Sequence, residues 1–108
     1  MKYRYKFPLA IEFSEAHTKA FHRIRKNLIL DRDFFLDCQK LCQERKDFQN
    51  ARFFSDNSKH LLTCLKALDY IGKYHLGLKT NVEVDPFLAQ YVNEMLYTID
   101  TEATLHHD

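Results

Sequence analysis

Two pairs of potential metal ligands, each spaced four residues apart, are the residues of this chain best suited to chemistry. Cys38 and Cys42 form one pair, and His60 and Cys64 form the other. Residues four apart share one face of a helix, so each pair could hold a soft ion such as Zn²⁺ or Cu⁺. A hairpin turn near Ser55 would leave the pairs about one helical turn out of register. We therefore expect reduced, buried, metal-free cysteines, and keep a metal-binding helical bundle as an alternative.

No motif typical of an enzyme accompanies these ligands. The sequence has no glycine-framed serine, no phosphate-binding loop and no His-Glu-x-x-His pattern. His17 and His75 fall on apolar stripes, where a hydrogen-bonded core histidine is the ordinary role. We predict that the protein is not an enzyme and uses no cofactor.

Basic side chains concentrate near the N-terminus and interleave there with aromatic rings. The candidates for partner binding are Lys2, Tyr3, Arg4, Tyr5, Lys6, Lys19, Arg23 and Lys26. Such cations could release counterions from a nucleic-acid backbone while the rings stack on bases. However, residues 1–30 carry seven basic and two acidic side chains, whereas residues 83–108 carry six acidic and none basic. The two regions could therefore neutralise each other in the fold instead.

The first thirteen residues have the period of two that is typical of an extended segment. Apolar side chains occupy the odd positions from Tyr3 to Phe13, and Pro8 indicates an edge. We expect an extended arm over residues 1–13 and at most a short two-stranded ribbon that joins it to residues 79–84.

From Ser14 onward, the chain predicts helices. Ser14 is a good N-cap for a first helix, and Asp31 or Asp33 would begin a second, with Phe34, Leu41 and Phe48 inward. The run 55–58 predicts a loop before a third helix. Pro86, at a first helical position after the N-cap Asp85, would open a fourth, and residues 101–108 should fray. We predict one mainly α domain over residues 1–108, a compact antiparallel bundle of three to four helices.

The remaining signals favour binding to a macromolecule. Several aromatic residues are left over from the apolar stripes, and aromatic side chains are enriched among interface anchors. They are Phe35, Phe53, Phe54, Tyr70, Tyr74 and Tyr97. We predict an interaction or regulatory module that binds a protein through its helical faces and its arm, with a nucleic-acid-binding regulator as the alternative, and a homodimer formed through the arm.

The expected cellular compartment follows from the length of the apolar runs and the number of cysteines. No apolar run approaches the ~20 residues of a membrane span, and three cysteines are not a disulfide framework. We expect a cytoplasmic protein with no membrane partner.

Overall fold

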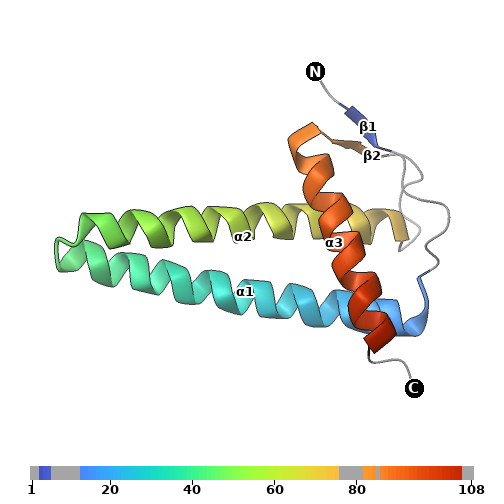
Figure 1. Cartoon of the computed structure of the whole chain (residues 1–108), viewed down its shortest axis with the longest axis horizontal. Helices are drawn as coiled ribbons and strands as arrows, with labels where there is room; N and C mark the ends of the chain where they lie inside the picture. Colours follow the sequence, from blue (N-terminus) through green and yellow to red (C-terminus); the bar gives the residue numbers. More distant parts are fainter. Residues whose placement is uncertain (1–2, 6–12, 76–81, 85, 106–108) are drawn as a thin grey trace.

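The computed structural model describes residues 3–5, 13–75, 82–84 and 86–105. Its helices are α1 (Glu15–Glu44), α2 (Phe48–His75) and α3 (Pro86–Leu105), which confirms a mainly α protein. Strands β1 (Tyr3–Tyr5) and β2 (Val82–Val84) pair antiparallel, with Arg4 opposite Glu83. Figure 1 shows α1 and α2 side by side as a long hairpin, with α3 lying across one end of it. The rest of the expected arm and the N-cap position Asp85 lie outside the described residues.

Helix α1 begins where the sequence predicted and ends much later. The Ser14 side chain accepts a hydrogen bond from the backbone N–H of His17, and the His17 ring accepts one from the backbone N–H of Ser14. This reciprocal pair satisfies two N–H groups that a helix start leaves unpaired. The predicted break at Asp31 or Asp33 is wrong, because α1 continues through both residues to Glu44. Neither a glycine nor a proline interrupts it.

The turn between the long helices lies at residues 45–47, without a glycine. Lys46 has a φ of 58°, its N–H bonds the Gln43 carbonyl at 3.1 Å, and the Asp47 N–H bonds the Cys42 carbonyl at 2.8 Å. This is the Schellman arrangement that closes a helix C-terminus. The Asp47 side chain then accepts from the backbone N–H of Asn50 and caps α2.

The predicted loop at residues 55–58 is wrong, because this run lies inside α2. Its polar side chains bond carbonyls of their own helix. The Asn57 amide donates to the Phe53 carbonyl and the Ser58 hydroxyl to the Ser55 carbonyl, both at 2.8 Å. Such back-bonding satisfies polar side chains without ending a helix.

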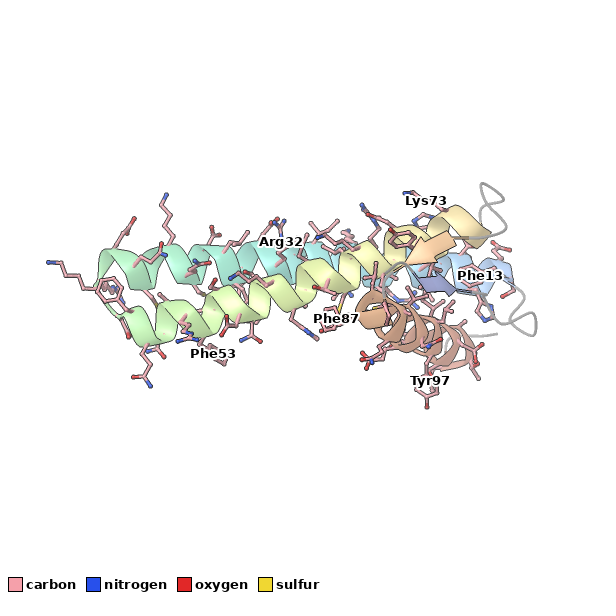
Figure 2. The ribbon with its side chains drawn as sticks, turned by 90° about the horizontal axis from the view of Figure 1, so that it is seen from above. Phe13, Arg32, Phe53, Lys73, Phe87 and Tyr97 are labelled. Carbon is pink, nitrogen blue, oxygen red and sulfur yellow. The ribbon has the colours of Figure 1, made fainter. Side chains whose placement is uncertain are left out.

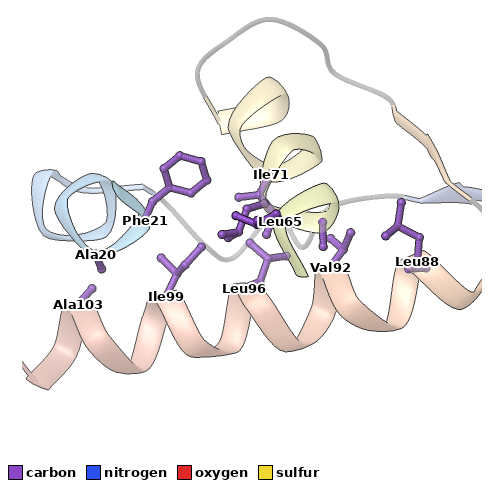
Figure 3. Packing of buried hydrophobic residues seen from close by; sticks show 12 residues of the cluster. Ala20, Phe21, Leu65, Ile71, Leu88, Val92, Leu96, Ile99 and Ala103 are labelled. Carbon is purple, nitrogen blue, oxygen red and sulfur yellow. The ribbon is translucent and has the colours of Figure 1, made fainter. Parts of the chain in front are cut away.

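Helix α3 starts at Pro86, as predicted, and extends to Leu105. The expected fraying is therefore wrong for residues 101–105, since Ala103 is buried against α1. Small side chains make this contact possible. Figure 3 shows Ala103 beside Ala20, while Leu96 and Val92 point toward α2.

The hydrophobic core fills the end of the hairpin that α3 crosses. It comprises Ala20, Phe21, Leu65, Ala67, Leu68, Ile71, Leu88, Ala89, Val92, Leu96, Ile99 and Ala103. Gly72 lets the Phe21 ring approach α2, because a Cβ added at Gly72 would lie 3.1 Å from the Phe21 Cζ. All three helices contribute, so this end is a conventional three-helix core.

The other end of the hairpin has almost no core. Between residues 30 and 60, all of which are described, only Ala51 and Ser58 are buried. The radius of gyration is 16.1 Å, against ~13 Å for a compact chain of this length. The molecule is thus an elongated hairpin with its core at one end, and not the compact bundle that the sequence predicted.

Candidate functional site

The basic start of α1 contacts the acidic helix α3. His17 Nε2 lies 2.9 Å from Asp100 Oδ1, and Arg23 donates a hydrogen bond to Glu102 at 3.1 Å. The two oppositely charged regions of the sequence therefore meet in the fold, at least through these pairs. This contact is what the alternative to nucleic-acid binding predicted.

Two of the three predicted basic residues on α1, Lys19 and Arg23, have acidic partners. Besides the Arg23 pair, Lys19 lies 3.4 Å from Glu15, and the neighbouring Arg25 lies 3.7 Å from Asp69. Lys26 forms no ion pair with the described residues; with His22 and Arg25 it lines an open hollow of about 270 Å³. Tyr3, Arg4 and Tyr5 form β1, whereas Lys2 and Lys6 lie outside the described residues. Among the predicted residues whose side chains the structure describes, Lys19 and Arg23 are paired with carboxylates and Lys26 lines the hollow.

Ser14, His17 and Asp100 form a chain of hydrogen bonds. Ser14 Oγ lies 2.8 Å from His17 Nδ1, and His17 Nε2 contacts the Asp100 carboxylate. A hydroxyl, an imidazole and a carboxylate in sequence are the components of nucleophilic catalysis. Here Ser14 Oγ also accepts the backbone N–H of His17, and Phe13 stacks on the ring with centroids 5.4 Å apart. The three residues thus cap α1 and join it to α3.

The potential metal ligands do not converge. The turn at residues 45–47 places Cys38 and Cys42 near the tip of the hairpin. Phe35 contacts Phe54 across the hairpin, so Cys38 is level with about residue 51, ~20 Å along α2 from Cys64. In the part of the chain that the structure describes, no three His, Cys, Asp or Glu residues are grouped so that they could hold a metal ion.

Cys64 is a buried thiol within a small polar cluster. Its Sγ lies 3.9 Å from His60 Nε2, and His60 Nδ1 is 3.0 Å from the Tyr91 hydroxyl on α3. Burial, and then the nearby charge of Glu94, raise the pKa of the Cys64 thiol. Burial was expected for all three cysteines, but Cys38 and Cys42 are only half-buried.

A set of exposed apolar side chains extends the surface that α3 covers. We call it the distal apolar face. It consists of Leu30, Phe34, Leu41, Phe53 and Phe87, which are 56%, 62%, 46%, 57% and 62% exposed. Figure 2 shows Phe53 and Phe87 on the side of the hairpin where α3 lies and Arg32 on the opposite side.

Helix geometry explains why Phe34 and Phe53 lie on the side that α3 covers. Phe53 precedes Ile71, which α3 buries, by five full turns of 3.6 residues. Phe34 follows Ala20, which packs against α3, by nearly four turns. Both apolar stripes thus run beneath α3 and continue uncovered toward the tip.

Aromatic contacts tie this face to the hairpin interior. The ring of Phe34 contacts Phe35, Phe35 contacts Phe54 across the two helices, and Phe54 contacts Phe53, with centroid separations of 5.9, 6.0 and 5.4 Å. A row of four rings therefore crosses the hairpin, exposed at both ends of the row and half-buried in the middle. Such a row presents large apolar groups whose positions are already held by their neighbours.

The opposite side of the hairpin tip is polar by comparison. An open groove of about 590 Å³ lies there, lined by Phe48 together with Arg52, Asp56, Lys59 and other residues. Phe48 is 68% exposed. It provides a ring similar to Phe53 on the same helix but on another side.

Only part of the distal apolar face was predicted from the sequence. Phe53 was among the leftover aromatic residues, but Phe34 and Leu41 were predicted to point inward, as was Phe48, and all three are exposed. The error came from the helix break predicted at Asp31. A new helix starting there would turn residues 34–48 to a different side than one continuous helix does. Continuing the spacing of Phe21, Ile24 and Leu28 without a break would have placed Phe35 inward and Phe34 outward.

Comparison of the chain with protein-family models, with curated proteins and with solved structures found no significant match. No helix within the described ranges has the length and apolar character to cross a membrane.

Proposed function

We propose that the chain is a small protein-binding module that acts by binding rather than by catalysis, and that the distal apolar face is its docking surface. The observation that carries this proposal is the continuity of the apolar stripes. The side of the hairpin that α3 buries at one end carries four large exposed apolar residues beyond α3, and Phe87, in the first turn of α3, lies on the same side. Large exposed apolar side chains gathered on one side of a folded chain are typical of an interaction site.

The character of the face favours protein over nucleic acid as the partner. Its exposed groups are phenylalanine and leucine, whereas a nucleic-acid site needs cations facing the phosphates. Arg23 and Lys19, two of the predicted contacts, already pair with Glu102 and Glu15. A cytoplasmic location is part of the proposal and is supported by three free cysteines.

A photo-activated cross-linking residue would test this function directly. Placed at position 53, it should cross-link to protein in a lysate of the native cells, with or without nuclease treatment. Placed at position 48, on the same helix but another side, it should give little product. Equal yields at both positions, or a product lost on nuclease treatment, would refute the proposed docking surface.

A further inference from the structure

We infer that the occupant of the distal apolar face is the same face of a second copy of this chain, related by a two-fold axis. The inference rests on the proposed function and names the partner. Two hairpins would cross face to face near their tips. This differs from a dimer formed through the N-terminal arm, because both surfaces are helical.

The exposed area of the distal apolar face is large enough for an interface between two copies of the chain. Phe34, Phe53 and Phe87 are each about 60% exposed, and an aromatic side chain offers ~200 Å², so with the two leucines the face presents roughly 500 Å². Two copies would together bury roughly 1,000 Å² of apolar side chain before any polar rim is added, which reaches the lower bound for a specific interface. In a two-fold contact both copies use the same surface, so one apolar face supplies both halves of the interface.

The dimensions of the uncovered stretch fit a helical hairpin. Leu30 and Leu41 are eleven residues apart on α1, which is ~16 Å along the helix. Packed helices lie ~8–10 Å apart, so there is room beside α3 for two helices crossing as α3 does. The tip of α1 and α2 in a second copy supplies two such helices, already held side by side (Figure 1).

The charges near the tip are compatible with contact between the same face of two copies. Residues 30–60 carry six basic side chains and six acidic ones, so this segment has no net charge. A strongly acidic or basic partner would find no complementary field there. Two neutral tips meet without net repulsion, and their mixed charges can pair at the rim.

Light scattering and sedimentation equilibrium of the purified full chain test the inference. Over about 5–500 µM, a range that brackets a weak interface of this size, the wild-type mass should rise from 12.9 kDa toward twice that value. Phe53→Glu and Phe34→Glu should each weaken the association at least about tenfold. Phe48→Glu is the matched control and should associate like the wild type, because Phe48 lies outside the face.

The outcomes separate this inference from the proposed function. A wild-type chain that stays monomeric over the whole range overturns the second copy as the partner, as does an equal loss of association in Phe48→Glu and Phe53→Glu. If the monomeric chain still cross-links another protein from position 53, the docking function stands and the partner is a different one. Circular dichroism of each variant should match the wild type, since the substituted rings are exposed.

Discussion

Individual side chains hold the beginning of α1 against the second half of α3. His17 is the clearest example: its ring completes the cap of α1, stacks on Phe13 and contacts Asp100 on α3. The N-cap Ser14 and a hydrogen-bonded His17 were both predicted from the sequence, and the structure confirms them. The partner Asp100 was not predictable, because a contact between residues 83 positions apart depends on where α3 crosses the hairpin.

Replacing His17 tests how much this junction contributes. We expect His17→Ala to lower the free energy of unfolding by about 1–2 kcal/mol, since it removes a cap partner and an interhelical hydrogen bond. Urea unfolding of His17→Ala, Asp100→Ala and the double variant would give a coupling energy of about 0.5–1 kcal/mol. Strictly additive losses would show that the contact contributes nothing to stability.

Cys64 should be the least reactive of the three thiols. It is 4% exposed, and burial together with the charge of Glu94 raises its pKa above the ordinary value of 9.0. We therefore expect alkylation of the native chain near pH 8 to modify Cys38 and Cys42 before Cys64. Peptide mapping by mass spectrometry measures the order. A faster reaction at Cys64 would contradict the burial that the structure shows.

The same shift has a consequence for stability. The folded state holds the Cys64 proton more tightly than the unfolded state does. The contribution of this proton to the free energy of unfolding is therefore complete below the unfolded-state pKa of ~9, and it is lost as the pH rises through the raised pKa of the folded state. A Cys64→Ala variant would lack this alkaline component and serves as the control.

At the scale of elements, the structure differs from the sequence prediction mainly in where the hairpin turns. Residues 55–58 look like a loop because Ser, Asp and Asn favour turns, yet within α2 they bond their own helix. The actual turn at residues 45–47 has no glycine, and its signal was Asp47, a cap followed by the apolar Phe48. Pro86 was read correctly because proline at a first helical position has few other roles.

Lys46 offers a direct test of this turn. Its φ of 58° lies in the left-handed region, where a residue with a Cβ is strained by about 1 kcal/mol relative to glycine. We expect Lys46→Gly to raise the free energy of unfolding by about that amount in thermal or urea unfolding. Lys40→Gly, inside α1, should instead destabilise by ~1 kcal/mol. A loss of stability in Lys46→Gly would show that the turn is formed differently.

At the scale of the whole molecule, packing is concentrated at one end. The core of α1, α2 and α3 surrounds Ile71 and Ile99, while the hairpin tip is held mainly by Ala51, Ser58 and the half-buried rings of Phe35 and Phe54. The apolar residues at both ends of the hairpin could be identified from the sequence. Which of them α3 covers could not be predicted, because that depends on the angle at which α3 crosses the hairpin.

Hydrogen exchange should report this gradient. In dilute solution, we expect backbone amides of residues 48–58 to exchange faster than those of residues 64–72, since local opening needs less apolar surface to be exposed at the tip. Exchange measured by mass spectrometry at low and high protein concentration would also detect association, as added protection at the tip alone. Uniform protection along α2 in the monomer would contradict the gradient.

The junction between α1 and α3 also constrains the order in which the chain folds. The His17 and Arg23 contacts join residues 83 and 79 positions apart, whereas α1 and α2 meet through a three-residue turn. Closing the long loop costs more chain entropy, so the hairpin should form first and α3 should dock last. Ile99→Ala should then accelerate unfolding with little change in the refolding rate, which stopped-flow measurements would detect. During synthesis, the apolar side of the hairpin would stay uncovered until α3 has been made.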